Sequence, residues 1–242
     1  DSYIIQEDAS GTSSFNSGDG VDTFTFESGF EGRAYIDAGD NGVKTLNLNG
    51  GEVSQWFSGS GDDVITSSIG TFLNYWGGGG LRTNAGNDTI TLDGELSPYS
   101  RNYLGEGDDT LILRGGSGRY DSVYVYGENG NDTFTLSGDE HYWIHSWLGN
   151  GNDIYDASAA TNYNDRSYTY GDSGNDTLIG NHDNNLFYGG DDDDSINGGN
   201  GDNTLHGDNG NDSIESGSGA DTIYGGNNDD ILNAGGGNDV IY

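Results

Sequence analysis

The sequence predicts an all-β chain that coils into a solenoid, in which short strands stack along one long axis. Three observations predict it: a nine-residue repeat over residues 171–242, a related Gly/Asp motif that recurs every 19 to 25 residues upstream, and alternation of apolar and polar residues after each motif. Short fixed periods are typical of solenoids, and a period of two is typical of strands.

Residues 171–242 divide into eight units of nine residues with no insertion. They read GDSGNDTLI, GNHDNNLFY, GGDDDDSIN, GGNGDNTLH, GDNGNDSIE, SGSGADTIY, GGNNDDILN and AGGGNDVIY. The eighth residue of each unit is apolar: Leu178, Phe187, Ile196, Leu205, Ile214, Ile223, Leu232 and Ile241. Because the chain is only 31% hydrophobic, this regularity predicts that these side chains face a narrow core.

The same motif recurs with looser spacing in residues 18–170. The fragments GDGVDTFTF, SGSGDDVIT, NAGNDTITL, GEGDDTLIL, ENGNDTFTL and GNGNDIYDA carry it. A spacing near 22 residues indicates one motif turn per coil, with one strand before each turn and one after it. We therefore expect one elongated solenoid over 1–242, with long irregular coils in 1–170 and regular coils in 171–242. A separate all-β domain followed by a 72-residue repeat region is the alternative.

The nonapeptides resemble the repeats-in-toxin (RTX, hemolysin-type) calcium-binding repeat, whose pattern is G-G-x-G-x-D-x-U-x with U a large apolar residue. The resemblance is close over 171–242 and loose over 18–170. It implies a right-handed parallel β-roll or β-helix solenoid, in which Gly/Asp-rich turns bind calcium and the last three residues of each unit form a strand. It also implies export in unfolded form through type I secretion.

The resemblance points to the motif aspartates as calcium ligands, with each ion between turns one coil apart. The expected metal residues are Asp22, Asp63, Asp88, Asp109, Asp132, Asp153, Asp176, Asp194, Asp212, Asp221, Asp230 and Asp239. Two nonapeptides make one coil, so the turns alternate between two edges. On the second edge Asn185 and Asn203 replace the first two aspartates, so the early sites there should be weak or absent. Counting the gaps between turns predicts about ten Ca²⁺.

Lys44 stands at the aspartate position in the fragment DNGVKTLNL. Two interpretations are open. Its ammonium could take the place of a calcium ion and pair with neighbouring carboxylates. Alternatively, the register shifts so that Asp40 occupies the motif position.

The composition restricts the function classes. The chain has 41 acidic and 7 basic residues, a formal net charge of −34 and no cysteine. This acidity argues against binding nucleic acid, and the lack of cysteine excludes disulfides and thiolate zinc sites. No apolar run is long enough to insert into a membrane. Dense like charges favour expansion, so we expect calcium to be the ion that folds the chain.

Other candidate chemistry is weaker. No catalytic or cofactor-binding residues are predicted, since the four histidines (His141, His145, His182 and His206) lie in unlike contexts. Six arginines lie upstream of residue 171, several of them near tyrosines. These pairs could hold an acidic polysaccharide, or the aromatic rings could fill the wider interior of the long coils while the arginines balance local acids.

The expected function is that of a calcium-binding structural protein, secreted or on a bacterial surface, in a surface layer, fibre or adhesin. Strand-like segments at both ends of the sequence suggest either head-to-tail association with further copies or a piece cut from a larger secreted protein. The alternative is a carbohydrate-binding or secretion module of a secreted polysaccharide-acting enzyme, protease or lipase. A polysaccharide lyase or epimerase is the third possibility, and we expect the chain not to be an enzyme.

Overall fold

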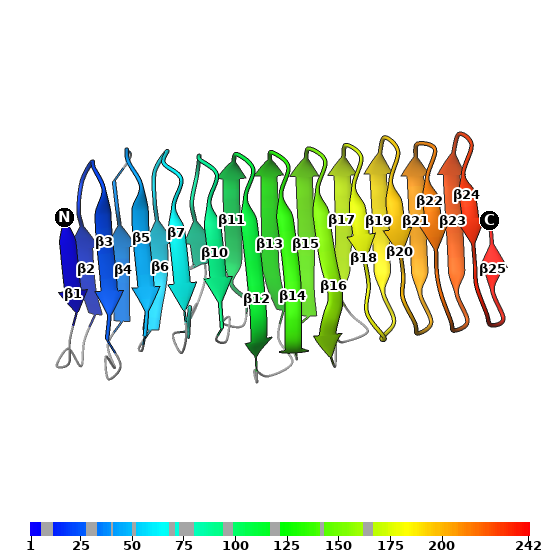
Figure 1. Cartoon of the computed structure of the whole chain (residues 1–242), viewed down its shortest axis with the longest axis horizontal. Helices are drawn as coiled ribbons and strands as arrows, with labels where there is room; N and C mark the ends of the chain where they lie inside the picture. The colour runs from blue at the N-terminus through cyan, green and yellow to red at the C-terminus, as the bar shows by residue number, and fades with distance from the viewer. Residues whose placement is uncertain are drawn as a thin grey trace.

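The computed structural model describes residues 1–5, 12–27, 33–39, 41–49, 52–67, 71–72, 80–93, 99–116, 122–140, 143–161 and 167–242. Within these ranges the regular elements are all strands. The strands form two parallel sheets that follow the long axis of the molecule (Figure 1). The predicted parallel β-solenoid is therefore confirmed. None of the described residues form a helix that could cross a membrane.

Each coil contributes one strand to each sheet. The first sheet, here called sheet A, contains β1 (Ser2–Ile5), β3 (Asp22–Phe26), β5 (Lys44–Leu48), β7 (Val64–Ser67), β10 (Thr89–Leu92), β12 (Thr110–Gly116), β14 (Thr133–Glu140), β16 (Ile154–Thr161), β18 (Thr177–Ile179), β20 (Ser195–Asn197), β22 (Ser213–Glu215) and β24 (Ile231–Asn233). Sheet B contains β2 (Thr12–Asn16), β4 (Arg33–Asp37), β6 (Glu52–Phe57), β9 (Gly80–Arg82), β11 (Arg101–Glu106), β13 (Ser122–Asn129), β15 (Trp143–Asn150), β17 (Tyr168–Ser173), β19 (Leu186–Asp191), β21 (Thr204–Asn209), β23 (Thr222–Asn227) and β25 (Val240–Ile241). The short strand β8 (Thr71–Phe72) pairs with β6.

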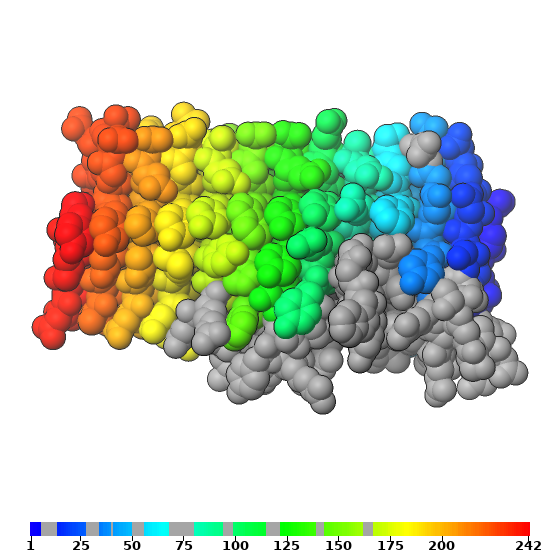
Figure 2. Space-filling model, turned by 180° about the vertical axis from the view of Figure 1, so that it is seen from behind, coloured from blue at the N-terminus to red at the C-terminus, as the bar shows by residue number. Residues whose placement is uncertain are grey.

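The strand register confirms the predicted order of the motif turns. Asp22 pairs with Lys44 across β3 and β5, and the later sheet A strands continue that alignment coil by coil. The motif turns connect sheet B to sheet A along one edge of the solenoid, the upper edge in Figure 1. Successive coils cross the molecule as parallel bands (Figure 2). Both sheets continue from the long coils into the nonapeptide coils, although the assignment of one domain stays a prediction.

The core is a narrow apolar layer between the two sheets. Of the predicted inward residues in the nonapeptides, those from Leu178 to Ile223 are buried. Leu232 is only partly buried and Ile241 is 51% exposed, because β24 and β25 end their sheets and no further described coil covers them. In the long coils, Phe24, Leu46, Ile65, Ile90, Leu111, Phe134 and Tyr155 are buried at the equivalent position. Because this core is narrow, we expect the turns to contribute strongly to stability.

Candidate metal-binding turns

The motif aspartates, apart from Asp221 and Asp239, lie along the upper edge, and most of them are buried. Their placement depends on glycines in the turn with positive φ, such as Gly151 (φ 144°) and Gly174 (φ 119°), where an L side chain would be strained. Asp63, Asp88, Asp109, Asp132, Asp153, Asp176, Asp194 and Asp212 are each at most 3% exposed. We call these eight residues, with Asp230, the aspartate column.

One oxygen of each column carboxylate has a defined partner. Oδ1 accepts a hydrogen bond from the backbone N–H of the aspartate one coil earlier, for example from Asp132 to Asp153 at 2.7 Å and from Asp153 to Asp176 at 2.8 Å. The same bond recurs from Lys44 to Asp63 and down to Asp212 and Asp230, at 2.6 to 3.0 Å. These bonds fix the carboxylate orientation, so the other oxygen of each group faces the turn.

Among the described residues, that second oxygen is buried and has no hydrogen-bond donor in eight column aspartates, all but Asp230, and in Asp221 on the opposite edge. The group comprises Oδ2 of Asp63, Asp88, Asp109, Asp132, Asp153, Asp176, Asp194, Asp212 and Asp221. In the nonapeptide turns Oδ2 lies against the first glycine of its own turn: a Cβ built on Gly171 would collide with Oδ2 of Asp176 and with the carbonyl oxygen of Gly189. A buried carboxylate oxygen without a partner is costly, so this arrangement fits a bound cation.

Lys44 shows which atoms surround a cation in such a turn. Its side chain is fully buried, and Nζ donates to Gly18 O at 2.9 Å, Gly20 O at 2.7 Å and Asp22 Oδ2 at 2.7 Å. The Asp22–Lys44 register places Lys44 in line with the aspartate column, which supports the interpretation that its ammonium takes a cation position. Asp40, the residue of the alternative, lies outside the described residues.

The carboxyl pKa values reflect this difference in surroundings. Burial would raise the pKa of Asp22, but the hydrogen bond from the Lys44 ammonium and further hydrogen bonds lower it to about 2. In the column, burial raises the pKa to about 6 for Asp63 and Asp153, about 7 for Asp88, Asp132 and Asp194, and about 8 for Asp109 and Asp176. Neighbouring column aspartates add to the rise at Asp109 and Asp176. A column without cations therefore retains protons near neutral pH.

The second edge carries a shorter column of the same kind. The backbone N–H of Asn203 donates to Oδ1 of Asp221 at 2.8 Å, and that of Asp221 donates to Oδ1 of Asp239 at 3.1 Å. Oδ2 of Asp221 has no donor. The side-chain amides of Asn185 and Asn203 instead donate to backbone carbonyls of the turns. The two asparagines therefore differ from the aspartates in charge, and also because their side chains donate hydrogen bonds to the turn.

Exposed Asp and Asn side chains precede the column residues and form a separate ladder. Their Oδ1 atoms accept hydrogen bonds from the backbone of the next coil, as from Asn131 to Asp108 and from Asp193 to Asn175. Sequence reasoning did not identify this ladder, although an Asp or Asn before most motif aspartates is the signal for it. These hydrogen bonds link successive turns on their exposed side. They do not involve the buried Oδ2 atoms of the aspartate column.

The described residues contain no group of three or more His, Asp or Glu side chains that converges on one point. A metal ion in these turns would therefore be held by backbone carbonyl oxygens together with one or two carboxylates. Ca²⁺ accepts such mixed oxygen sets, including backbone carbonyls. The residues present thus fit calcium, and none of the described histidines takes part.

The aromatic residues correct one expectation, because the described tyrosines near the arginines do not fill the interior, while Tyr120 and Tyr163 lie outside the described residues. Tyr124 and Tyr126 alternate in β13 with the buried Val123 and Val125, so they lie on the outer face of sheet B. One continuous outer stack comprises Tyr103, Tyr126, Trp147, Tyr170, Tyr188, His206, Tyr224 and Tyr242, with ring centroids 4.4 to 6.0 Å apart. Arg82 lies over the ring of Tyr103, 4.5 Å from its centroid. Arg33, Arg119 and Arg166 have no described side chains.

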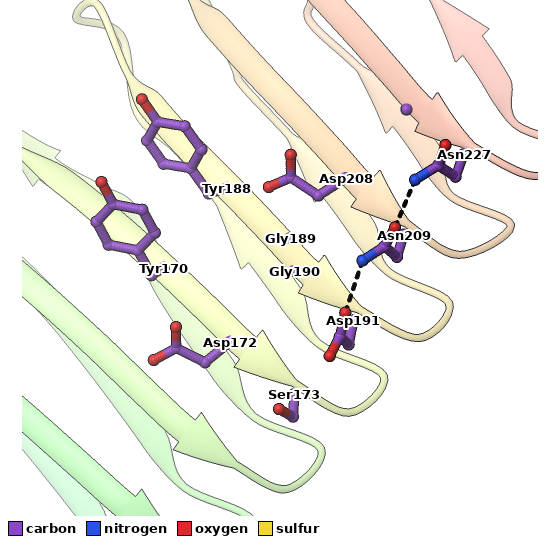
Figure 3. Close-up of a pocket in the computed structure, with 11 residues that line it drawn as sticks. Tyr170, Asp172, Ser173, Tyr188, Gly189, Gly190, Asp191, Asp208, Asn209 and Asn227 are labelled. Atoms are coloured by element: carbon purple, nitrogen blue, oxygen red, sulfur yellow. Dashed lines mark hydrogen bonds between the residues drawn. The ribbon is translucent and has the colours of Figure 1, made fainter.

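A groove of about 680 Å³ lies beside this stack on the nonapeptide coils. Tyr170 and Tyr188 form one wall, and the hydrogen-bonded series Asp191, Asn209 and Asn227 forms the other (Figure 3). Asp172 and Asp208 also line it. Residues 171–242 contain no Lys or Arg, so the groove is acidic.

The comparisons with known proteins agree with the repeat pattern. Residues 170–205 and 206–241 each match the family model of the RTX calcium-binding nonapeptide repeat, in four copies. No curated protein and no solved structure matches the chain. The matched region is the region of regular coils.

Proposed function

We propose, from the RTX calcium-binding nonapeptide repeats that make up residues 170–241, that this chain is an extracellular structural protein whose coils fold when calcium enters the turns. RTX repeats bind Ca²⁺ and are typical of secreted proteins, and their β-roll is a structural element rather than a catalytic family. A place in a surface layer, fibre or adhesin, and association with further copies, belong to the proposal.

The observation that carries the proposal is the set of nine buried Oδ2 atoms that have no donor among the described residues. Bound calcium would place a positive charge next to these carboxylate oxygens, in place of the missing hydrogen-bond donors. The chain's own residues shape the site. Glycines leave room in the turn, and backbone N–H groups hydrogen-bond to Oδ1, so that Oδ2 faces the interior of the turn. The column also runs upstream of the matched repeats, since Asp63 to Asp153 have the same bonds. The proposal therefore extends calcium binding to the long coils.

Two adjacent residues provide a matched test in the long coils. Asp109 is buried with an unpartnered Oδ2, whereas Asp108 is exposed and accepts from Asn131. Both Asp109→Asn and Asp108→Asn remove one negative charge. We expect Asp109→Asn to raise the calcium concentration at half-maximal folding at least tenfold, about 1.4 kcal/mol, because an amide N–H₂ replaces a charged oxygen in the turn. Asp108→Asn should shift it by less than about twofold.

Calcium titrations followed by far-ultraviolet circular dichroism measure both midpoints. Equal shifts in the two variants would show that net charge, rather than the column, sets the calcium response. No shift in either would argue against calcium binding by the long coils.

The groove beside Tyr170 and Tyr188 favours a second function, that of a glycan-binding module. Tyrosine, carboxylate and amide groups in one elongated groove suit hydroxyl or amine groups of a polymer. Because the groove is acidic, it suits an uncharged or amino glycan. The acidic polysaccharide proposed for the arginine and tyrosine pairs upstream of residue 171 is a separate hypothesis.

This second function predicts a defined ligand preference. In saturating calcium, retention on immobilised amino glycan should fall at least fivefold in Tyr188→Ala and Asp208→Asn, about 1 kcal/mol. Retention on an acidic polysaccharide should be near zero throughout. Affinity electrophoresis measures both, with Asp108→Asn as a control outside the groove. Equal retention of all variants would show that the groove is not the glycan-binding site.

A further inference from the structure

In three of the described motif turns, a side-chain nitrogen donates hydrogen bonds to backbone carbonyls of the turn. The first is the turn of Asp22. An ammonium has three N–H donors, and those of Lys44 have three acceptors within 2.9 Å: two backbone carbonyls and the Asp22 carboxylate. The ammonium is completely buried and its positive charge faces a carboxylate 2.7 Å away.

The other two are the first turns of the second edge. The Asn185 amide nitrogen contacts Asp183 O at 2.7 Å and Gly198 O at 2.9 Å, so it joins carbonyls of two successive turns. The Asn203 amide nitrogen repeats this, with Gly201 O at 3.1 Å and Ser216 O at 3.0 Å. Both side chains are at most 4% exposed.

The next turn on the same edge provides the contrast. At Asp221 the equivalent side chain has no nitrogen, and its Oδ2 is buried without a donor. Asn185 Oδ1 is also buried without a partner among the described residues, so the contrast lies in the nitrogen: the Asn185 and Asn203 amides donate to turn carbonyls, and Asp221 has no such donor. The distinction follows the residue type at one position of the motif.

We propose that Lys44, Asn185 and Asn203 close their turns to calcium by occupying the position of the ion, so that these turns fold without metal. The inference rests on the proposed function, since it requires that the remaining turns bind calcium. Under this inference, the side chain at the position of the motif aspartate determines whether a turn binds a metal ion. Asp22, although a motif aspartate, is then a partner of Lys44 rather than a calcium ligand.

Calcium stoichiometry of the full chain tests the inference. Lys44→Asp and Asn203→Asp each restore a carboxylate at the motif position, and each should bind one Ca²⁺ more than the wild type. Asn175→Asp is the matched control: it adds a carboxylate to a turn at the exposed ladder position, where aspartate already occurs at Asp108 and Asp193, and should bind no additional ion. Metal analysis after gel filtration in saturating calcium gives the counts.

The wild-type count separates the two levels of the proposal. A wild type without bound calcium would remove the proposed function. A wild type that binds calcium, with unchanged counts in both Lys44→Asp and Asn203→Asp, would overturn only the closure of these turns. A gain in Asn175→Asp equal to that in Asn203→Asp would also overturn it, because charge alone would then explain the gain.

A second measurement needs no variant. Lys44 is the only lysine in the sequence, so amine-specific acetylation at this residue can be read by peptide mass spectrometry. In saturating calcium we expect Lys44 to stay unmodified for a period that modifies it completely in urea. Rapid modification in folded, calcium-saturated protein would show that calcium displaces the ammonium, and would refute the proposal.

Discussion

Removal of calcium at pH 8 is expected to abolish most of the β-sheet circular dichroism of this chain, and readdition of calcium should restore it. The reason is the stacking of column carboxylates one coil apart, about 4.8 Å. Two unit charges at that distance repel by about 3.5 kcal/mol at an effective dielectric constant of about 20. Several such pairs exceed the stability of a typical domain, about 5–15 kcal/mol.

The core that opposes this repulsion is a narrow layer between the sheets, formed by side chains from both of them between Phe24 and Ile223. Calcium binding would therefore contribute directly to the free energy of folding. Magnesium at the same concentration should restore much less structure, because it prefers octahedral geometry and keeps its waters. A β-sheet spectrum that survives complete removal of calcium would contradict the proposed role of the column.

The pH dependence of stability should reverse between the calcium-free and the calcium-bound chain. Without calcium, burial raises the pKa of the seven column aspartates from Asp63 to Asp194 to about 6 to 8. In the unfolded chain these groups titrate near 3.8. Between these values the folded state binds more protons, so its stability is greatest at low pH and is lost as pH rises through the folded-state pKa values. The loss is about 1.4 kcal/mol per pH unit for each such group.

With calcium the direction is opposite, because carboxylate ligands must lose their protons before they bind the ion. We therefore expect the calcium-free chain to show a thermal unfolding transition at pH 5 and little or none at pH 8, where most of its β-structure is already lost. The calcium-saturated chain should melt at a higher temperature at pH 8 than at pH 5. Thermal melts on protein freed of calcium by resin, with and without added calcium, test all four conditions. Calcium-free stability that increases with pH would show that the column is not buried as described.

Much of the fold followed from local pattern. The motif position of Asp109, the strand after it and the inward direction of Leu111 all depend on residues within a few positions of one another. The alignment of Asp22 with Lys44 also followed from spacing, since turns of the same type stack when each coil closes once.

The outer aromatic stack had a signal in the sequence that the motif analysis did not use. Tyr126 and Tyr170 each lie six residues before a motif aspartate, and the same offset applies to the other column turns from Asp109 to Asp230. Spacing alone could not show which face these rings occupy. That depends on the strand phase in β13 and β17, which the buried Val125 and Thr169 fix.

The sequence by itself determined where the turns and strands lie and that acidic turns stack one coil apart, because these features depend on short-range periodicity. Only the tertiary structure decided which atoms meet inside each turn. The Lys44 side chain reaches back one coil to Asp22, and the Asn203 amide reaches forward to Ser216. Such contacts join residues of neighbouring coils, so they exist only once the coils are stacked, and side-chain length and donor type then decide whether a turn needs a metal ion.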